Sequence, residues 1–150
     1  MLKNKPRAYA EIKGAAAYPK LRGVITFQAT TEDVWVTANI AGLPNQSDYG
    51  NCGVFGFHIH SGGSCTGTME NEFENAEGHF NPDGKPHPYH AGDMPPLFAC
   101  NGLAYLSFLT NRFTIDEIKG RTVIIHQNPD DFTTQPSGNA GKMIACGVIR

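Results

Sequence analysis

The feature that most constrains the fold of this chain is a series of short runs in which apolar and polar residues alternate. In the run Val34–Ile40, the even-numbered residues are Val, Val, Ala and Ile, and the odd-numbered residues are Trp, Thr and Asn. A period of two residues is typical of a β-strand with one buried face. We expect eight strands: Arg7–Lys13, Gly23–Ala29, Val34–Ile40, Gly53–His60, Leu97–Cys100, Gly102–Thr110, Thr122–Gln127 and Met143–Ile149.

Helical periodicity is confined to the short segment Thr114–Ile118, where Thr114 and Glu117 have the spacing of a capping box. The pattern therefore predicts an all-β fold, a sandwich or a barrel. A length of 150 residues suits one domain with a sizeable core, and no change of composition marks a second. We expect residues 1–150 to form a single domain.

Charge and hydropathy narrow the range of partners. The formal net charge is −2 and the basic residues are scattered, which argues against a nucleic-acid partner. The N-terminal segment lacks the apolar core of a signal peptide, and no run approaches the length of a membrane span. We expect no membrane partner.

The four cysteines, Cys52, Cys65, Cys100 and Cys146, are widely spaced and form no C-x-x-C pair. This spacing suits two disulfides better than a thiolate metal site. Disulfides favour an oxidising compartment, periplasmic or extracellular, over the alternative of a cytoplasmic location. The sequence alone leaves the compartment open.

Two long connections interrupt the regular spacing of the strands, Ser61–Asp93 and Asn128–Lys142. Long loops in a compact domain usually carry function. The first contains His79, His87, His90 and Asp93 within a stretch rich in glycine and proline. Three imidazoles and one carboxylate make a complete tetrahedral set for zinc. The alternative is a solvated loop rich in histidine, but the tightly turned backbone favours convergence of these side chains.

The other histidines lie at the ends of expected strands. His58 and His60 are two residues apart and therefore point to the same face of one strand, although polar side chains on a solvated face would show the same pattern. His126 ends another strand just before the second long connection. Six histidines and Asp93 give seven ligands, which complete two four-coordinate sites if one imidazole bridges them. A site made only of histidines can hold copper, which makes redox chemistry the expected function.

Five motifs together resemble the copper/zinc superoxide dismutase family: GFHIH, GHFNP, HAGDMP, GRTVIIH followed by DDF, and PSGNAGKMIACGVI. The likeness spans Arg7 to Ile149. It implies an eight-stranded Greek-key β-barrel, a flattened sandwich with two long functional loops. It also implies copper at His58, His60, His79 and His126, and zinc at His79, His87, His90 and Asp93.

The same resemblance assigns further residues. It makes Asp130 the carboxylate that orients His58 and His87, whereas the alternative is a surface aspartate that caps the loop, a role better suited to Asp131. It pairs Cys65 with Cys146. Cys52 and Cys100 lie outside the family pattern but at the ends of what would be neighbouring strands, so a second disulfide competes with two buried free thiols.

Three departures from the family pattern stand out. The segment between His87 and His90 is short, and the segment Phe132–Gly138 is also short and lacks charged residues. The active-site arginine of the family aligns with Met143, and Lys142 beside it is the candidate substitute, although an ammonium does not reproduce a guanidinium fork. Acidic residues also follow Cys65: Glu70, Glu72, Glu74 and Glu77.

The implied activity is dismutation of superoxide to dioxygen and hydrogen peroxide by a copper site, with His79 as the bridging ligand and proton relay. The competing hypothesis is a non-enzymatic copper- and zinc-binding protein on the same scaffold. The uncharged Met143 and the acidic residues predict an enzyme slower than its family. A homodimer is compatible with the sequence, which does not itself fix the oligomeric state.

Overall fold

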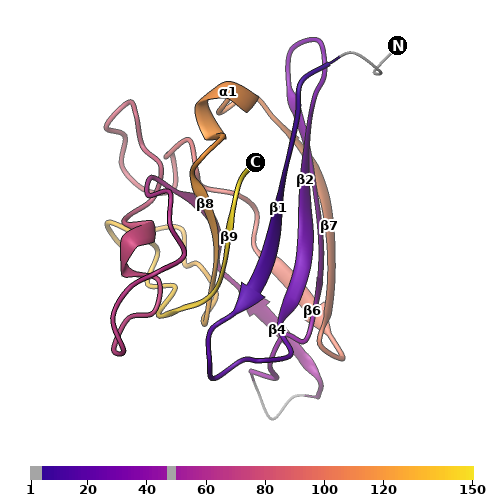
Figure 1. Cartoon of the computed structure of the whole chain (residues 1–150), viewed down its shortest axis with the longest axis vertical. Coiled ribbons are helices and arrows are strands. Elements are labelled where there is room, and N and C mark those ends of the chain that lie inside the picture. Colours follow the sequence, from indigo (N-terminus) through magenta and orange to yellow (C-terminus); the bar gives the residue numbers. More distant parts are fainter. Residues whose placement is uncertain (1–4, 47–49) are drawn as a thin grey trace.

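Nine antiparallel strands form a nearly closed barrel in the computed structural model, which describes residues 5–46 and 50–150 (Figure 1). The strands are β1 (Arg7–Gly14), β2 (Arg22–Ala29), β3 (Val34–Ala41), β4 (Cys52–Phe55), β5 (Phe57–His60), β6 (Leu97–Cys100), β7 (Leu103–Thr110), β8 (Thr122–His126) and β9 (Met143–Val148). A 3-10 turn, η1 (Glu74–Ala76), and one turn of helix, α1 (Ile115–Ile118), complete the elements.

The strand order is β4-β6-β7-β3-β2-β1-β9-β8-β5. After β3 the chain forms β4 and β5, which lie at the two ends of the sheet. It then forms β6 and returns as β7 to pair with β3, which is Greek-key connectivity. The prediction of an all-β Greek-key barrel is thereby confirmed. Figure 1 shows the two long connections together on one side of the barrel, beside β8 and β9.

The expected strand Gly53–His60 is divided at Gly56 into β4, which pairs with β6, and β5, which pairs with β8. The two ends of the sheet therefore belong to one run of chain, which nearly closes the barrel. The Gly56 amide donates to the Asn128 carbonyl, and the Gly56 carbonyl accepts from the His126 amide, both at 2.8 Å. A Cβ at Gly56 would lie 2.8 Å from the Ala140 Cβ, so glycine allows this close approach.

The apolar face of each strand points into the barrel. Val36, Ala38 and Ile40 on β3 are fully buried, whereas Trp35, next to Val36, is 47% exposed. In β5, Phe57 and Ile59 belong to the central core. Because side chains alternate along a strand, His58 and His60 then lie on the outer face of the barrel. The period-two pattern thus sets which face of β5 carries the histidines.

The first long connection is fixed to the outside of the barrel. Phe73 and Ala76 pack with Ile124 of β8 and Cys146 of β9 in a second apolar cluster. The Cys65–Cys146 disulfide joins this loop to β9. A second disulfide joins Cys52 and Cys100, which lie directly opposite each other in β4 and β6.

The short helix agrees with its predicted capping box. The Thr114 hydroxyl accepts from the Glu117 amide, and the Glu117 carboxylate accepts from the Thr114 amide at 2.7 Å. In the described ranges, no helix has the length and apolar character needed to cross a bilayer.

Candidate metal centre

The outer face of β5 is covered by the segment that contains the predicted zinc ligands. Isolated β-bridges pair His60 with His79 and His58 with Asp93. The Phe80 amide donates to the Ile59 carbonyl, and the Ile59 amide donates to the Gly92 carbonyl, both at 2.8 Å. These hydrogen bonds place the loop directly over the two β5 histidines.

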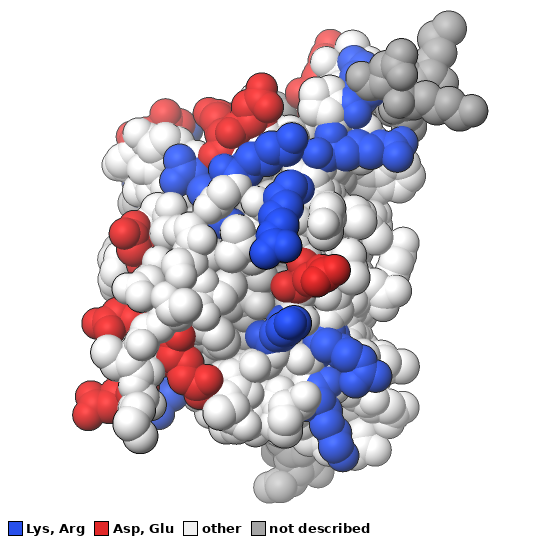
Figure 2. Space-filling view, viewed as in Figure 1, with Lys and Arg blue, Asp and Glu red and all other residues white. Residues whose placement is uncertain are grey.

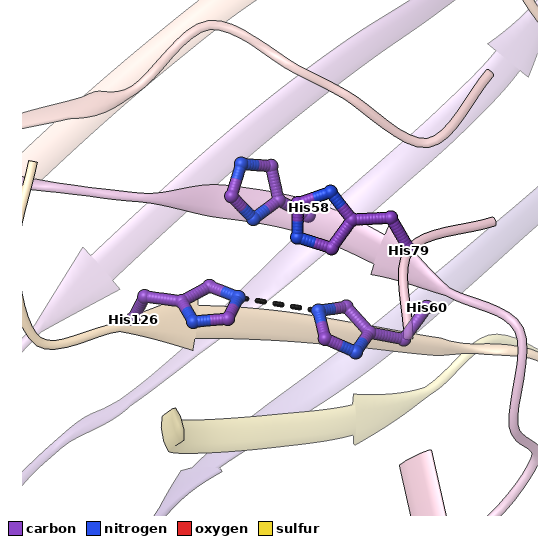
Figure 3. Close-up of side chains that lie close together, drawn as sticks. All are labelled: His58, His60, His79 and His126. Carbon is purple, nitrogen blue, oxygen red and sulfur yellow. Dashed lines mark hydrogen bonds between the residues drawn. The ribbon is translucent and has the colours of Figure 1, made fainter. Parts of the chain in front are cut away.

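His126 reaches the same place from β8, the neighbour of β5 in the sheet. Its Nε2 lies 3.1 Å from Nε2 of His60. Figure 3 shows His58 and His60 extending from β5, His126 from β8 and His79 from the loop, with their rings turned toward one another. We call His58, His60, His79 and His126 the four-histidine set.

Hydrogen bonds fix which nitrogen of each imidazole faces the centre. Nδ1 of His60 donates to the Glu77 carbonyl at 2.7 Å, and Nδ1 of His126 donates to the Gly141 carbonyl at 3.1 Å. Nε2 of His58 lies 2.7 Å from the Asp130 carboxylate. The nitrogens left as ligands are therefore Nε2 of His60 and His126 and Nδ1 of His58.

A second group of donors lies beside the first: His79, His87, His90 and Asp93, which we call the mixed set. Nδ1 of His79 lies 2.8 Å from Oδ1 of Asp93 and 3.3 Å from Nδ1 of His90. Nδ1 of His87 lies 3.0 Å from Oδ2 of Asp93. Zinc–ligand bonds of about 2.0 Å give tetrahedral edges of about 3.3 Å, so these spacings suit a zinc ion.

His79 belongs to both sets, because its Nδ1 faces the mixed set and its Nε2 is free for the other. Three buried nitrogens make no hydrogen bond among the described residues: His58 Nδ1, His79 Nε2 and His87 Nδ1, the last of which lies near the Asp93 carboxylate but outside hydrogen-bond geometry. A buried polar atom left unpaired costs about 1–3 kcal/mol. All three nitrogens are ligand atoms of the two sets, so a metal ion bound in each set gives every one of them a partner. The residues fit copper in the four-histidine set and zinc in the mixed set.

Asp130 connects the two sets through hydrogen bonds to one histidine of each. Its Oδ2 accepts from His58 at 2.7 Å, and its Oδ1 accepts from Nε2 of His87 at 2.8 Å. Burial would raise the pKa of Asp130, but these two hydrogen bonds and one from the Phe132 amide lower it well below its usual range. Asp130 therefore remains a carboxylate that orients one histidine of each set.

Asp131 has the structural role considered for it in the sequence. Its Oδ1 accepts from the amides of Thr133 and Thr134, at 2.9 and 2.8 Å, and its Oδ2 accepts from the Thr134 hydroxyl. Asp131 therefore caps the loop, whereas Asp130 orients the histidines.

The imidazoles of His58, His60 and His126 are held neutral. Burial, with repulsion from neighbouring imidazoles, lowers the pKa of His58 to about 4 and that of His126 to about 3. The pKa of His60 is lowered well below 6.5 for the same reasons. A neutral imidazole keeps the lone pair that a metal needs, so these three histidines are ready to bind a metal at neutral pH.

A cleft of about 890 Å³ opens over the four-histidine set, with His60, His79 and His126 in its wall. Lys142 and Met143 line it, as do three of the four acidic residues noted in the sequence, Glu70, Glu72 and Glu77. Figure 2 shows acidic side chains gathered on the side where Figure 1 places segment 61–78, while basic side chains lie mainly over the strands. The approach to the cleft is therefore not strongly cationic.

Two residues that the sequence did not suggest also contact the mixed set. The Arg112 guanidinium donates to three carbonyls of the segment that carries His87, His90 and Asp93. The Gln135 side chain pairs with the backbone of His87. Neither residue belongs to a ligand motif, so spacing in the sequence gave no signal for them.

A Greek-key barrel whose outer face carries an all-histidine set and a mixed set with one shared imidazole defines a metalloprotein with a redox-capable centre. Residues 21–149 match the family model described as copper/zinc superoxide dismutase (SODC). The chain belongs to this family.

Curated relatives agree with the family match. Copper/zinc superoxide dismutase 2 of Aquifex aeolicus is 37% identical over 136 residues, covering 81% of this chain and 74% of the relative. The copper/zinc superoxide dismutase of Legionella pneumophila is 34% identical over 140 residues, covering 88% and 80%. That of Escherichia coli is 31% identical over 142 residues, covering 85% and 78%.

Proposed function

We propose that this chain is an enzyme that dismutates superoxide: two superoxide anions and two protons give one dioxygen and one hydrogen peroxide. The observation that carries the proposal is His79, which presents one nitrogen to each of two adjoining donor sets. A protein that only stored metals would have no need of a cleft leading to the histidines. Family membership supports the enzyme over the non-enzymatic alternative.

The four-histidine set holds copper and the mixed set holds zinc. Bound there, copper supplies the one-electron couple that the reaction requires, whereas zinc has no redox chemistry. Asp130 and the carbonyls of Glu77 and Gly141 keep the imidazoles in one tautomer and one orientation. This preorganisation holds the ligand atoms in place.

His79 is the residue that moves a proton. Its Nε2 is buried and has no hydrogen-bond partner among the described residues, while its Nδ1 is held beside Asp93. His79 also lines the cleft, so Nε2 is positioned to take up a proton and release it to a peroxide product. The mixed set keeps the ring oriented during this transfer.

Lys142 is the cation that attracts the anionic substrate. It is exposed and lines the cleft, whereas Met143 beside it adds no charge. A single ammonium in a cleft with three carboxylates focuses an anion weakly.

The test is metal loading followed by activity. After loading with copper and zinc, elemental analysis should find one of each per chain, and a xanthine-oxidase-coupled assay should show superoxide consumption. His79→Ala should lose most of the activity, and Arg22→Ala, on a strand that does not pair with β5 or β8, should retain it. Full loading of both metals with no superoxide consumption would support the storage alternative instead.

The two disulfides favour a location outside the reducing cytoplasm. We propose a periplasmic or extracellular location in particular. Protein extracted from its native cells under alkylating conditions should show no reactive thiols and should appear in the periplasmic or secreted fraction. Recovery in the cytosolic fraction with four alkylated cysteines would contradict this.

We further propose a homodimer. Phe98 on β6 and Leu103 and Tyr105 on the paired strand β7 are 71%, 63% and 71% exposed on the outside of the barrel. Such a group of large apolar side chains on adjacent strands suits a self-complementary interface. Sedimentation should give a dimer mass, and Tyr105→Lys should give the monomer. A monomeric wild type at high concentration would contradict the proposal.

A further inference from the structure

The segment His87–Asp93 supplies three of the four donors of the mixed set, and its carbonyl groups are held by side chains from outside it. Nη1 of Arg112 donates to the Pro88 carbonyl at 2.8 Å, and to the carbonyls of His90 and Asp93 at 3.3 and 3.4 Å. One nitrogen thus contacts the backbone of two metal ligands, His90 and Asp93, and of Pro88, which follows the ligand His87 in the chain.

Gln135 holds the first ligand of the same segment. Its Nε2 donates to the His87 carbonyl at 2.7 Å, and its Oε1 accepts from the His87 amide at 2.9 Å. The side-chain amide therefore pairs with the backbone of His87 in the way that a neighbouring β-strand would. This two-point contact fixes the position and the tilt of the residue.

The two contacts come from different parts of the fold. Arg112 lies between β7 and α1, on the body of the barrel, and Gln135 lies in the second long connection. Within the segment, the Asp93 amide donates to the His90 carbonyl at 3.2 Å, a longer bond than the best contact of either side chain. Backbone hydrogen bonds to Phe80 and Ile59 hold the segment at Gly92, whereas the contacts of Arg112 and Gln135 hold it at Pro88 and His87.

We propose that Arg112 and Gln135 are positioning residues for zinc: they hold the short His87–Asp93 segment in the geometry that lets its ligands converge. The inference rests on the proposed function, because it takes the mixed set to be the zinc site. Loss of a group that orients metal ligands typically weakens metal binding by about 10–100-fold. Neither residue touches the metal ligands' donor atoms, so both act through the backbone.

If charge were the only influence, loss of Arg112 would change zinc affinity in the direction opposite to the one that positioning predicts. A guanidinium near the site repels a zinc ion, so removing the charge would tighten zinc binding if charge were the main influence. Positioning predicts that removal weakens binding. Gln135 is neutral, and for it positioning is the relevant effect. Agreement between the two variants therefore separates positioning from charge.

The experiment compares Arg112→Met, Gln135→Ala and the matched control Arg22→Met, an exposed arginine on β2. Zinc dissociation constants are measured by competition with a chromophoric chelator, copper dissociation constants likewise, and the melting temperature of the metal-free protein is recorded. We expect zinc binding to weaken about tenfold or more in each of the first two variants. Copper affinity should change less than threefold, and the control should match the wild type.

Three outcomes would overturn the inference: unchanged zinc affinity in both variants, tighter zinc binding in Arg112→Met, or an equal loss of zinc affinity, copper affinity and metal-free stability, which would show a general structural role. The proposed function is tested separately by Asp93→Ala, which should abolish high-affinity zinc binding. A wild type that binds no zinc, or that binds it equally well without Asp93, would contradict both proposals. Zinc binding that depends on Asp93 but not on Arg112 or Gln135 would contradict this one alone.

Discussion

Asp130 lies 2.7 Å from Nε2 of His58, a bond between a buried carboxylate and a buried imidazole, and it is the link between the two donor sets. The other oxygen of the same carboxylate accepts from His87, a member of the mixed set. One side chain therefore orients a ligand in each set. A change at Asp130 should alter the binding of both metals, whereas a change at Arg112 or Gln135 should alter mainly the binding of zinc.

We predict that Asp130→Asn weakens copper and zinc binding together. An asparagine has one acceptor oxygen, so its amide group would face one of the two imidazole N–H groups, and that ring would have to rotate or change tautomer. The expected loss is about 10–100-fold in affinity for each metal, measured by chelator competition. Asp131→Asn is the matched control, because Asp131 caps the loop, and it should leave both affinities unchanged. Loss of only one metal in Asp130→Asn would contradict the shared role.

We predict that Gly138→Ala destabilises the centre. Gly138 has φ of +71°, and a Cβ there would lie 2.0 Å from Oδ1 of Asp130 and 2.7 Å from Nε2 of His87. Strain and clash together should lower the free energy of unfolding by about 1–3 kcal/mol and should weaken the binding of both copper and zinc. Gly84→Ala is the control: its φ is +62°, but no atom lies within 4 Å of the added Cβ. Denaturant unfolding and metal competition measure both effects, and equal results for the two variants would contradict the clash.

We predict that the metal-free protein loses stability as the pH falls below about 6.5. In the unfolded chain the histidines take up protons near their ordinary pKa of 6.5, whereas in the fold the pKa is about 4 for His58 and about 3 for His126. The unfolded state therefore binds more protons in this window, and each such histidine lowers the free energy of unfolding by roughly 1.4 kcal/mol per pH unit. Their contribution is fully present above pH 6.5.

Chemical denaturation of the metal-free protein at pH 7.5, 6.5, 5.5 and 4.5 measures this slope. His126→Asn should reduce the slope by roughly the share of one histidine, about 1.4 kcal/mol per pH unit. The depressed pKa of Asp93 and of Asp130 adds a further loss only at lower pH, as those carboxylates are protonated. A flat profile from pH 6.5 to 5.5 would contradict the prediction.

The strands and the donor residues could be predicted from the sequence because their signals are local. The alternation in Val34–Ile40 states which side chains are buried, and the two-residue spacing of His58 and His60 puts them on one face. The spacing of Thr114 and Glu117 likewise gave the capped turn. Each of these inferences requires only a few neighbouring residues.

The parts that the sequence did not reveal depend on contacts between distant segments. Arg112 and Gln135 meet the His87–Asp93 segment only after the barrel has formed, and neither has a distinctive neighbourhood in the chain. The break at Gly56 arises because the run pairs with two different strands. Glu72 was expected only to repel an anion, but its carboxylate accepts from the Ala16 amide at 2.9 Å and so also fastens the loop to the barrel.

The charges around the cleft bear on the rate of the enzyme. Met143 pairs with His126 across β8 and β9, at the edge of the four-histidine set, and it is half-buried and uncharged. Superoxide dismutases are a standard example of enzymes that approach the diffusion limit of about 10⁸–10⁹ M⁻¹s⁻¹, aided by steering of the anion. In this chain Lys142 faces the cleft together with Glu70 and Glu77. The steering field should be weak.

We therefore predict a wild-type rate constant about one to two orders of magnitude below the diffusion limit, because steering and one active-site cation are lost. Met143→Arg should raise the rate and tighten the binding of azide, since it adds a cation beside His126, and Lys142→Ala should lower the rate. Added salt should slow the wild type only weakly, because there is little attraction to screen, and should slow Met143→Arg more steeply. Superoxide decay followed after pulse radiolysis at several ionic strengths measures all three. A wild type near the diffusion limit with a steep salt dependence that Lys142→Ala leaves unchanged would show that another basic residue steers the substrate.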